Sequence, residues 1–143
     1  MNEIFRLVYI SEAHKQVCYT DLDNILFSSR NRNAQLGITG VLIHQDGFFI
    51  QLLEGEEEKV KEVISLIIKD RRHKHLRVIK EWSSTEPRYF EKWAMSFIDG
   101  DLEEKSHPFI QQLFSDIMLI DVPNENQFQT FFTTISSNGI QLK

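Results

Sequence analysis

One amide side chain, that of Gln51, stands out because it is polar on a segment that is otherwise predicted to be a buried strand. In the run FFIQLL at 48–53 it shares a strand face with Phe49 and Leu53, since successive strand residues point to opposite faces. A buried amide offers two donors and an acceptor, and an unpaired buried polar group costs about 1 to 3 kcal/mol. We therefore expect hydrogen-bond partners or a ligand beside Gln51. The residue alone is equally consistent with a core glutamine bonded to backbone.

A tyrosine hydroxyl, that of Tyr9, poses the same question on the segment IFRLVYI at 4–10. This segment alternates like a strand, with Tyr9 on the face of Phe5 and Leu7 and with Arg6 as the one charged residue of the opposite face. Taken alone, Tyr9 is typical of core packing with a hydrogen-bonded hydroxyl. If the first and third strands are neighbours, as in a ferredoxin-like topology, this phenol and the Gln51 amide can meet.

The other polar candidates have simple structural interpretations. Asn33 follows the first predicted helix, where asparagine commonly serves a turn or caps through its side chain. Asp70 and His73 are expected to close the second helix, where a histidine near basic residues is typically a helix-end cation. The acidic run that starts at Glu54 and ends at Glu58 is most simply a favourable acidic start of that helix.

Catalytic and metal-binding motifs do not occur in this sequence. It contains no GxGxxG, P-loop or nucleophile elbow, and no Cys and His set with the spacing of a zinc site. We therefore predict neither an enzyme nor a metal site.

Alternating and helical patterns define the elements that must position these residues. Five segments have the β-branched, alternating pattern of strands: 4–10, 38–44, 48–53, 77–82 and 92–98. Asp46 and Gly47 between the second and third predict a hairpin, and Pro87 lies in the loop between the last two. Helical spacing covers about 20–31 and a second segment with Val60, Val63, Ile64, Ile67 and Ile68. The order β-α-β-β-α-β-β predicts an α+β, ferredoxin-like mixed sheet with two helices on one face.

The C-terminal part has a different pattern, which predicts two further helices over 103–117 and 125–136 with Pro123 between them. No linker separates them from the rest, so we expect one domain over 1–100 and a helical extension over 101–143 that packs on the open face of the same sheet. The aromatic stripe of Phe128, Phe131 and Phe132 could also form a homo-oligomer or partner surface.

Charge and cysteine content limit the partners and the compartment. The formal net charge of −5 argues against direct nucleic-acid binding, which needs a positive surface to release counterions. The single cysteine, Cys18, cannot form an internal disulfide, and no secretory signal pattern opens the chain, so we expect a cytoplasmic protein. Apolar runs fall far short of the ~20 residues that span a bilayer, which predicts no membrane insertion.

Five short motifs in order give the chain a family resemblance. FRLVYIS at 5–11, GITGVL at 37–42, FFIQLLEGE at 48–56, KDRRH at 69–73 and KWAMSFI at 92–98 resemble the BLUF family of blue-light sensors. The match spans about residues 3–99, and the combination at these separations is specific although each fragment is weak.

The resemblance implies a flavin, usually FAD, between the two helices that cover the sheet. Tyr9 and Gln51 match the family's photoactive pair: blue light drives electron and proton transfer from the tyrosine to the flavin, and the glutamine then rearranges its hydrogen bonds. The altered hydrogen bonding gives a small red shift of the absorption. Trp93 and Met95 match the strand thought to carry the signal outward.

Further site residues follow from the same resemblance. Asn33 matches the asparagine that bonds the flavin's polar edge, Asp70 and His73 match positions that line the ring, and Ile25 and Ile67 match the apolar residues that sandwich it. The expected flavin-contacting set is completed by Ser29, Phe49 and Arg32. At Arg32 many relatives carry Asn or His, so this position departs from the family pattern.

Two other classes of function remain open at the level of sequence. One is a small ferredoxin-like enzyme of the acylphosphatase kind, for which no Gly-rich anion loop is present. The other is a colourless interaction module whose polar residues are satisfied core groups. For the sensor, FMN or riboflavin could replace FAD, and output is expected through contact with an unidentified protein partner or a second copy of the chain.

Overall fold

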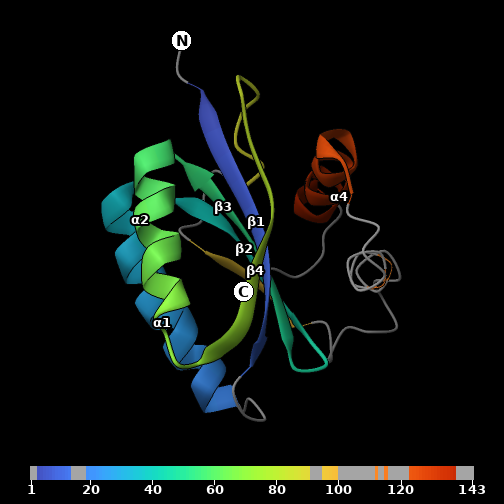
Figure 1. Cartoon of the computed structure of the whole chain (residues 1–143). Helices are drawn as coiled ribbons and strands as arrows, with labels where there is room; N and C mark the ends of the chain where they lie inside the picture. The colour runs from blue at the N-terminus through green and yellow to red at the C-terminus, as the bar shows by residue number, and fades with distance from the viewer. Residues whose placement is uncertain are drawn as a thin grey trace.

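Five strands and three helices make up the part of the chain that the computed structural model describes, residues 3–13, 19–90, 95–99, 112, 115 and 123–137 (Figure 1). Their bounds are β1 (Ile4–Ala13), α1 (Tyr19–Leu36), β2 (Thr39–Gln45), β3 (Phe48–Gly55), α2 (Glu57–Ile68), β4 (His73–Ser84), β5 (Ser96–Asp99) and α4 (Glu125–Ser137). None of the helices in these ranges is long and apolar enough to cross a bilayer.

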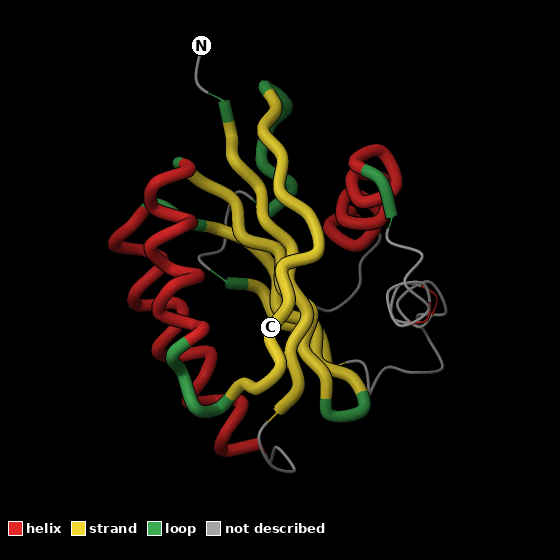
Figure 2. Tube along the Cα trace, in the orientation of Figure 1, coloured by secondary structure: helices red, strands yellow, loops and turns green. Residues whose placement is uncertain are grey.

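The strands form one mixed sheet in the order β4-β1-β3-β2-β5 (Figure 2). Neighbouring strands are antiparallel except for β2 and β5, which run parallel. The predicted α+β, ferredoxin-like architecture is confirmed, and so is the adjacency of the first and third strands on which the meeting of Tyr9 and Gln51 depends.

Period-two alternation divides the apolar side chains of the sheet between two cores. Leu7 and Tyr9 pack with α1 and α2 on one face, whereas Val8 and Ile10 pack with α4 on the other. Figure 1 shows the corresponding layers, with α1 and α2 on one side of the sheet and α4 on the opposite side.

The β2–β3 hairpin is closed by Asp46 and Gly47, the predicted Asp-Gly turn, whereas Gln45, which was predicted to lie in the connection, still pairs with Phe48 at the end of β2. Asp46 has φ 52° and Gly47 has φ 81°, the pair of positive values that a type I′ turn requires. The Gly47 carbonyl also accepts a hydrogen bond of 2.8 Å from the Ala13 N–H, so the turn is tied to the end of β1.

The first helix is longer than the sequence pattern indicates, and Asn33 therefore lies inside it rather than in a turn after it. The prediction for Asn33 was wrong because polar residues with adequate helix propensity carry α1 on to Leu36. Gly37, with φ 68°, ends the helix, and the Ile38 N–H donates back to the Asn33 carbonyl at 2.9 Å, the bond of a Schellman cap.

The second helix ends earlier than predicted. It stops at Ile68, so Asp70 lies in the following turn and His73 begins β4 instead of closing the helix. Pairing of His73 with Ala13 of β1 extends β4 over 73–84, well beyond the predicted 77–82. Glu54 is likewise a strand residue, because α2 starts only at Glu57.

The last helix, α4, confirms the prediction for 125–136. Asn124 caps it reciprocally with Gln127: each side-chain oxygen accepts the other residue's backbone N–H, at 2.9 and 2.8 Å. Phe128, Phe132 and Ile135 are fully buried against the sheet. The helix predicted over 103–117 falls almost wholly outside the described residues.

Candidate functional site

Tyr9 and Gln51 stand directly opposite each other on β1 and β3. The Tyr9 hydroxyl donates a hydrogen bond to Gln51 Oε1, and both side chains are buried. The predicted meeting of phenol and amide is confirmed. It results from strand register, which brings side chains 42 residues apart in sequence into contact.

The other end of the Gln51 amide is held by a methionine. Gln51 Nε2 donates to Met95 Sδ at 3.2 Å, and Met95 is fully buried immediately before β5. Arg30 of α1 fixes this residue in turn, since its Nε donates to the Met95 carbonyl at 2.9 Å. Both contacts of the amide are thus to side chains, which argues against a core glutamine bonded to backbone.

Two consecutive polar residues of α1 face the same region. Asn33 is fully buried, and Arg32 Nε donates to Asn33 Oδ1 at 3.2 Å. Arg32 Nη2 is buried and has no hydrogen-bond partner among the described residues. A buried guanidinium donor without an acceptor is costly, so this corner suits a ligand that offers carbonyl or other acceptor oxygens.

The start of β4 contributes a neutral imidazole. Burial lowers the pKa of His73 to about 4, although Asp70 acts in the opposite direction. Ser11 Oγ lies 2.8 Å from His73 Nδ1, so a hydrogen bond fixes the orientation of the ring. Burial by itself would raise the pKa of Asp70, but hydrogen bonds and positive charge from Arg72 lower it below its ordinary value.

Burial also controls the protonation of the phenol. It raises the pKa of Tyr9, an effect that the positive charge of Arg32 reduces and the negative charge of Asp70 reinforces. Tyr9 is therefore a neutral hydrogen-bond donor at physiological pH.

Apolar side chains from both helices and the sheet surround these polar groups. Ile25 of α1, Ile67 of α2 and Phe49 of β3 are buried in the same core as Tyr9, and Ser29 is buried on α1. The Phe49 ring lies 5.0 Å from the His73 ring between centroids. Apolar surroundings with a few placed polar groups fit a planar heteroaromatic ring such as a flavin. Trp93 lies outside the described residues.

Sequence reasoning missed two supporting residues. Ser11 could have been found, because it follows Tyr9 on the same strand face. Arg30 carried no signal, since its partner is a backbone carbonyl 65 residues away. Among the described residues, no group of His, Cys, Asp and Glu side chains could hold a metal ion.

The fold and this polar cluster define a class of small sensory domains, and the family comparison identifies it. The model for "BLUF: Sensors of blue-light using FAD" matches residues 4–96. The chain belongs to the BLUF family and is a blue-light photoreceptor domain that binds a flavin.

Curated relatives are much longer than this chain. The photoactivated adenylate cyclase subunit beta of Euglena gracilis is 34% identical over 90 residues, which are 63% of this chain and 10% of that protein. The blue light- and temperature-regulated antirepressor BluF of Escherichia coli (strain K12) is 30% identical over 100 residues, 69% of this chain and 24% of that protein. The matched regions thus cover a tenth to a quarter of these relatives.

Solved structures of similar length match almost end to end. The photo-activated state of BlsA has a TM-score of 0.79 and 26% identity, with 96% of this chain and 98% of that chain covered. The dark state of BlrB, a BLUF protein, has a TM-score of 0.74 and 27% identity with the same coverage.

Proposed function

We propose that this chain senses blue light through Tyr9 and Gln51, acting on a flavin held between α1 and α2. The observation that carries the proposal is the continuous buried contact from the Tyr9 hydroxyl through the Gln51 amide to Met95 Sδ. Such a chain can change state when one proton leaves it, because each hydrogen bond sets the orientation of the next group.

The bound flavin supplies the absorption of blue light and accepts one electron and one proton. Tyr9 is the donor of both: its burial favours the neutral phenol, so the hydroxyl proton is lost with or after the electron and not from the resting side chain. Without that proton, Gln51 Oε1 loses its donor and the amide is released to reorient. When Tyr9 regains both particles, the amide is held in its new orientation, and thermal return to the old one completes the cycle.

The remaining site residues are proposed to bind and orient the flavin. Asn33 and Arg32 offer polar groups to its edge, and the unpaired Arg32 Nη2 supports an acceptor there. Ile25 and Ile67 sandwich the ring, while its periphery is lined by Ser29, Phe49, Asp70 and His73. Met95 and Trp93 are proposed to relay the change in Gln51.

We propose FAD as the flavin, on the support of the family description. A structurally similar protein, BlrP1 of Klebsiella pneumoniae, has been solved with FMN, so the ring rather than the tail is the common requirement. Denaturation of the purified protein by acid or heat should release the flavin intact, and chromatography with mass measurement then identifies it. Flavin that stays on the denatured chain would indicate a covalent bond.

The output is proposed to be a change in protein contacts rather than catalysis by this chain. Relatives are named as cyclase subunits and as an antirepressor, which joins one sensor type to several outputs. A partner protein or a second copy of the chain, in the cytoplasm, fits the acidic charge and the absence of catalytic motifs in the sequence. The boundary between sensor and extension is proposed near residue 100.

An absorption spectrum before and after blue light tests the central proposal. A yellow protein with a reversible red shift supports the sensor. A protein that stays colourless after flavin supplementation would instead favour an interaction module. Hydrolysis of acyl phosphates by the purified protein would favour the alternative function of an acylphosphatase-like enzyme.

A further inference from the structure

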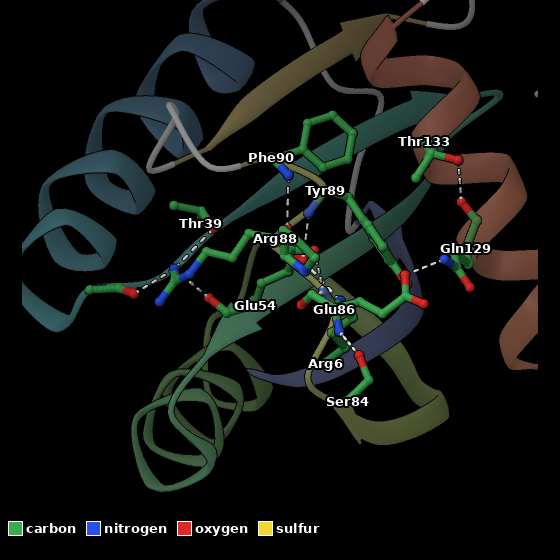
Figure 3. A network of polar contacts seen from close by, with 12 residues as sticks. Arg6, Thr39, Glu54, Ser84, Glu86, Arg88, Tyr89, Phe90, Gln129 and Thr133 are labelled. Atoms are coloured by element: carbon green, nitrogen blue, oxygen red, sulfur yellow. Dashed lines mark hydrogen bonds and ion pairs between the residues drawn. The ribbon is translucent and has the colours of Figure 1, made fainter. Parts of the chain in front are cut away.

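The face of β1 and β3 opposite the photoactive pair carries a buried ion pair. Arg6 and Glu54 are directly opposite each other in the two strands, and Arg6 Nε donates to Glu54 Oε2 at 2.9 Å (Figure 3). Both side chains are fully buried. Burying two charges is costly unless their remaining hydrogen-bonding groups also find partners, so the surroundings of the pair decide its role.

Those partners all come from the segment 84–90, which begins with the last residue of β4. Arg6 donates to Ser84 Oγ at 2.5 Å and to the carbonyls of residues 86 and 87 at 3.1 and 2.8 Å. The Glu54 carboxylate accepts the backbone N–H groups of Tyr89 and Phe90 at 2.9 and 3.0 Å. Five hydrogen bonds therefore fasten this segment to the two charges.

The helix α4 rests on the same segment. Gln129 Nε2 donates to the Glu86 carboxylate (Figure 3). The Phe132 ring stacks on Tyr89 with centroids 6.4 Å apart and meets Phe90 edge-on at 6.3 Å. The Arg6 guanidinium also lies over the Tyr89 ring, with its Cζ 4.1 Å from the ring centroid. The ion pair is thus connected to α4 through residues 84–90.

Strand register joins this assembly to the site. Arg6 is three residues from Tyr9 on β1, and Glu54 is three residues from Gln51 on β3, so the same two strands align both pairs on opposite faces. We propose that Arg6 and Glu54 are positioning residues that couple the Tyr9–Gln51 pair to α4, an inference that rests on the proposed function. A shift of β1 against β3 moves the ion pair, the pair moves residues 84–90, and those residues move α4.

The coupling works because the ion pair is fully hydrogen-bonded. Its two strands and the 84–90 segment cannot separate without leaving buried charge unpaired, so they move together. Met95 lies in the core on the α1 and α2 side, and α4 covers the other face, so a signal from Gln51 to α4 must pass through the sheet. The Arg6–Glu54 pair lies on the α4 side of the same two strands that carry Tyr9 and Gln51 on their other side.

Hydrogen exchange measured in dark and light on the full chain tests this coupling. In the wild type, light should change the exchange of 84–90 and 125–137. In Glu54→Gln, dark exchange in these ranges should quicken by about tenfold or more, because the negative charge is lost and an NH2 donor replaces one of the two acceptor oxygens, and the light-dependent difference should vanish. The light-induced red shift should persist in the same samples, which a merely structural failure of the site would not allow.

Two further variants keep the test decisive if Glu54→Gln folds poorly. Arg6→Met combined with Glu54→Leu replaces the pair with apolar groups and should retain fold and red shift while losing the light-dependent exchange in α4. Gln129→Ala removes only the hydrogen bond between α4 and Glu86 and should reduce the light-dependent change of exchange in α4. Glu57→Gln alters an exposed ion pair with Lys61 on α2 and serves as the matched control, with wild-type exchange expected.

The outcomes separate this inference from the proposed function. A wild type without a red shift would refute the sensor mechanism itself. A normal red shift with no light-dependent exchange in 125–137, or with wild-type light-dependent exchange in the doubly substituted protein, would overturn the coupling role and leave the sensor mechanism standing.

Discussion

The two faces of the β1–β3 strand pair carry opposite kinds of polar chemistry. On one face, Tyr9 and Gln51 form a short chain of neutral groups that ends on a methionine sulfur, a weak acceptor. On the other, the charges of Arg6 and Glu54 are surrounded by strong donors and acceptors. The neutral pair can reorganise at low cost, whereas the charged pair holds its surroundings in place.

This difference assigns switching to the Tyr9–Gln51 pair and a fixed arrangement of the surrounding segments to the Arg6–Glu54 pair. A group that must change partners during a photocycle needs alternatives of similar energy, and an amide beside a thioether provides them. A group that must transmit a displacement needs a single arrangement, which a saturated ion pair provides. Variants on the two faces should therefore fail in different ways.

The largest expected effect is loss of photochemistry on the neutral face. Tyr9→Phe and Gln51→Leu should bind flavin but lose the normal light-induced red shift, because the first removes the donated proton and the second the amide. Absorption spectra under blue light measure this. Tyr89→Phe, on the other face, is the matched control and should keep the shift; a wild-type photocycle in either site variant would show that the assigned pair is wrong.

The next effect is on stability and belongs to the charged face. Arg6→Met should lower the free energy of unfolding by about 3 to 5 kcal/mol, since it leaves a buried carboxylate unpaired, and adding Glu54→Leu should restore most of the loss. Urea denaturation provides the measurement. Lys61→Met, in an exposed pair, should change stability by less than about 1 kcal/mol. Additive effects of the two buried substitutions would contradict the coupling of this pair.

A smaller effect concerns pH and His73. Its pKa of about 4 in the folded protein lies below the ordinary 6.5, so between these values the unfolded chain binds a proton that the folded chain does not. The contribution of His73 to stability is therefore complete above pH 6.5 and falls as the pH drops to about 4, by at most about 1.4 kcal/mol per pH unit. Urea midpoints at several pH values should fall less steeply in His73→Gln. If the urea midpoints of the wild type and of His73→Gln fall equally with decreasing pH, other titrating groups cause the loss of stability in acid.

The smallest effect tests the weak end of the neutral chain. Met95→Leu nearly preserves volume and should cost less than about 1.5 kcal/mol. The substitution removes the Met95 Sδ acceptor of Gln51 Nε2 and so weakens the amide orientation that this bond favours. Dark recovery should therefore slow by about two- to five-fold with the red shift retained. The decay of the light-adapted spectrum measures this rate. An unchanged rate would show that the sulfur contact does not favour that arrangement.

Local pattern predicted much of this molecule. Period-two alternation placed Tyr9, Gln51 and Phe49 on their correct faces, and Asp46–Gly47 predicted the hairpin, because both depend on neighbours within a few residues. The motif resemblance supplied the flavin and the photoactive pair. The predicted ends of α1 and α2 are wrong, because helix ends depend on caps and on strand pairing as well as on periodicity.

Only the tertiary structure decided which polar groups meet. Nothing local distinguishes Arg6 from a solvent-exposed strand residue or Glu54 from the acidic start of α2, yet their register across β1 and β3 makes them a buried pair 48 residues apart. The bond from Arg30 to the Met95 carbonyl is equally invisible in sequence. Hydrogen bonds between distant segments depend on the relative placement of whole elements, and that placement is set by the packing of the two cores.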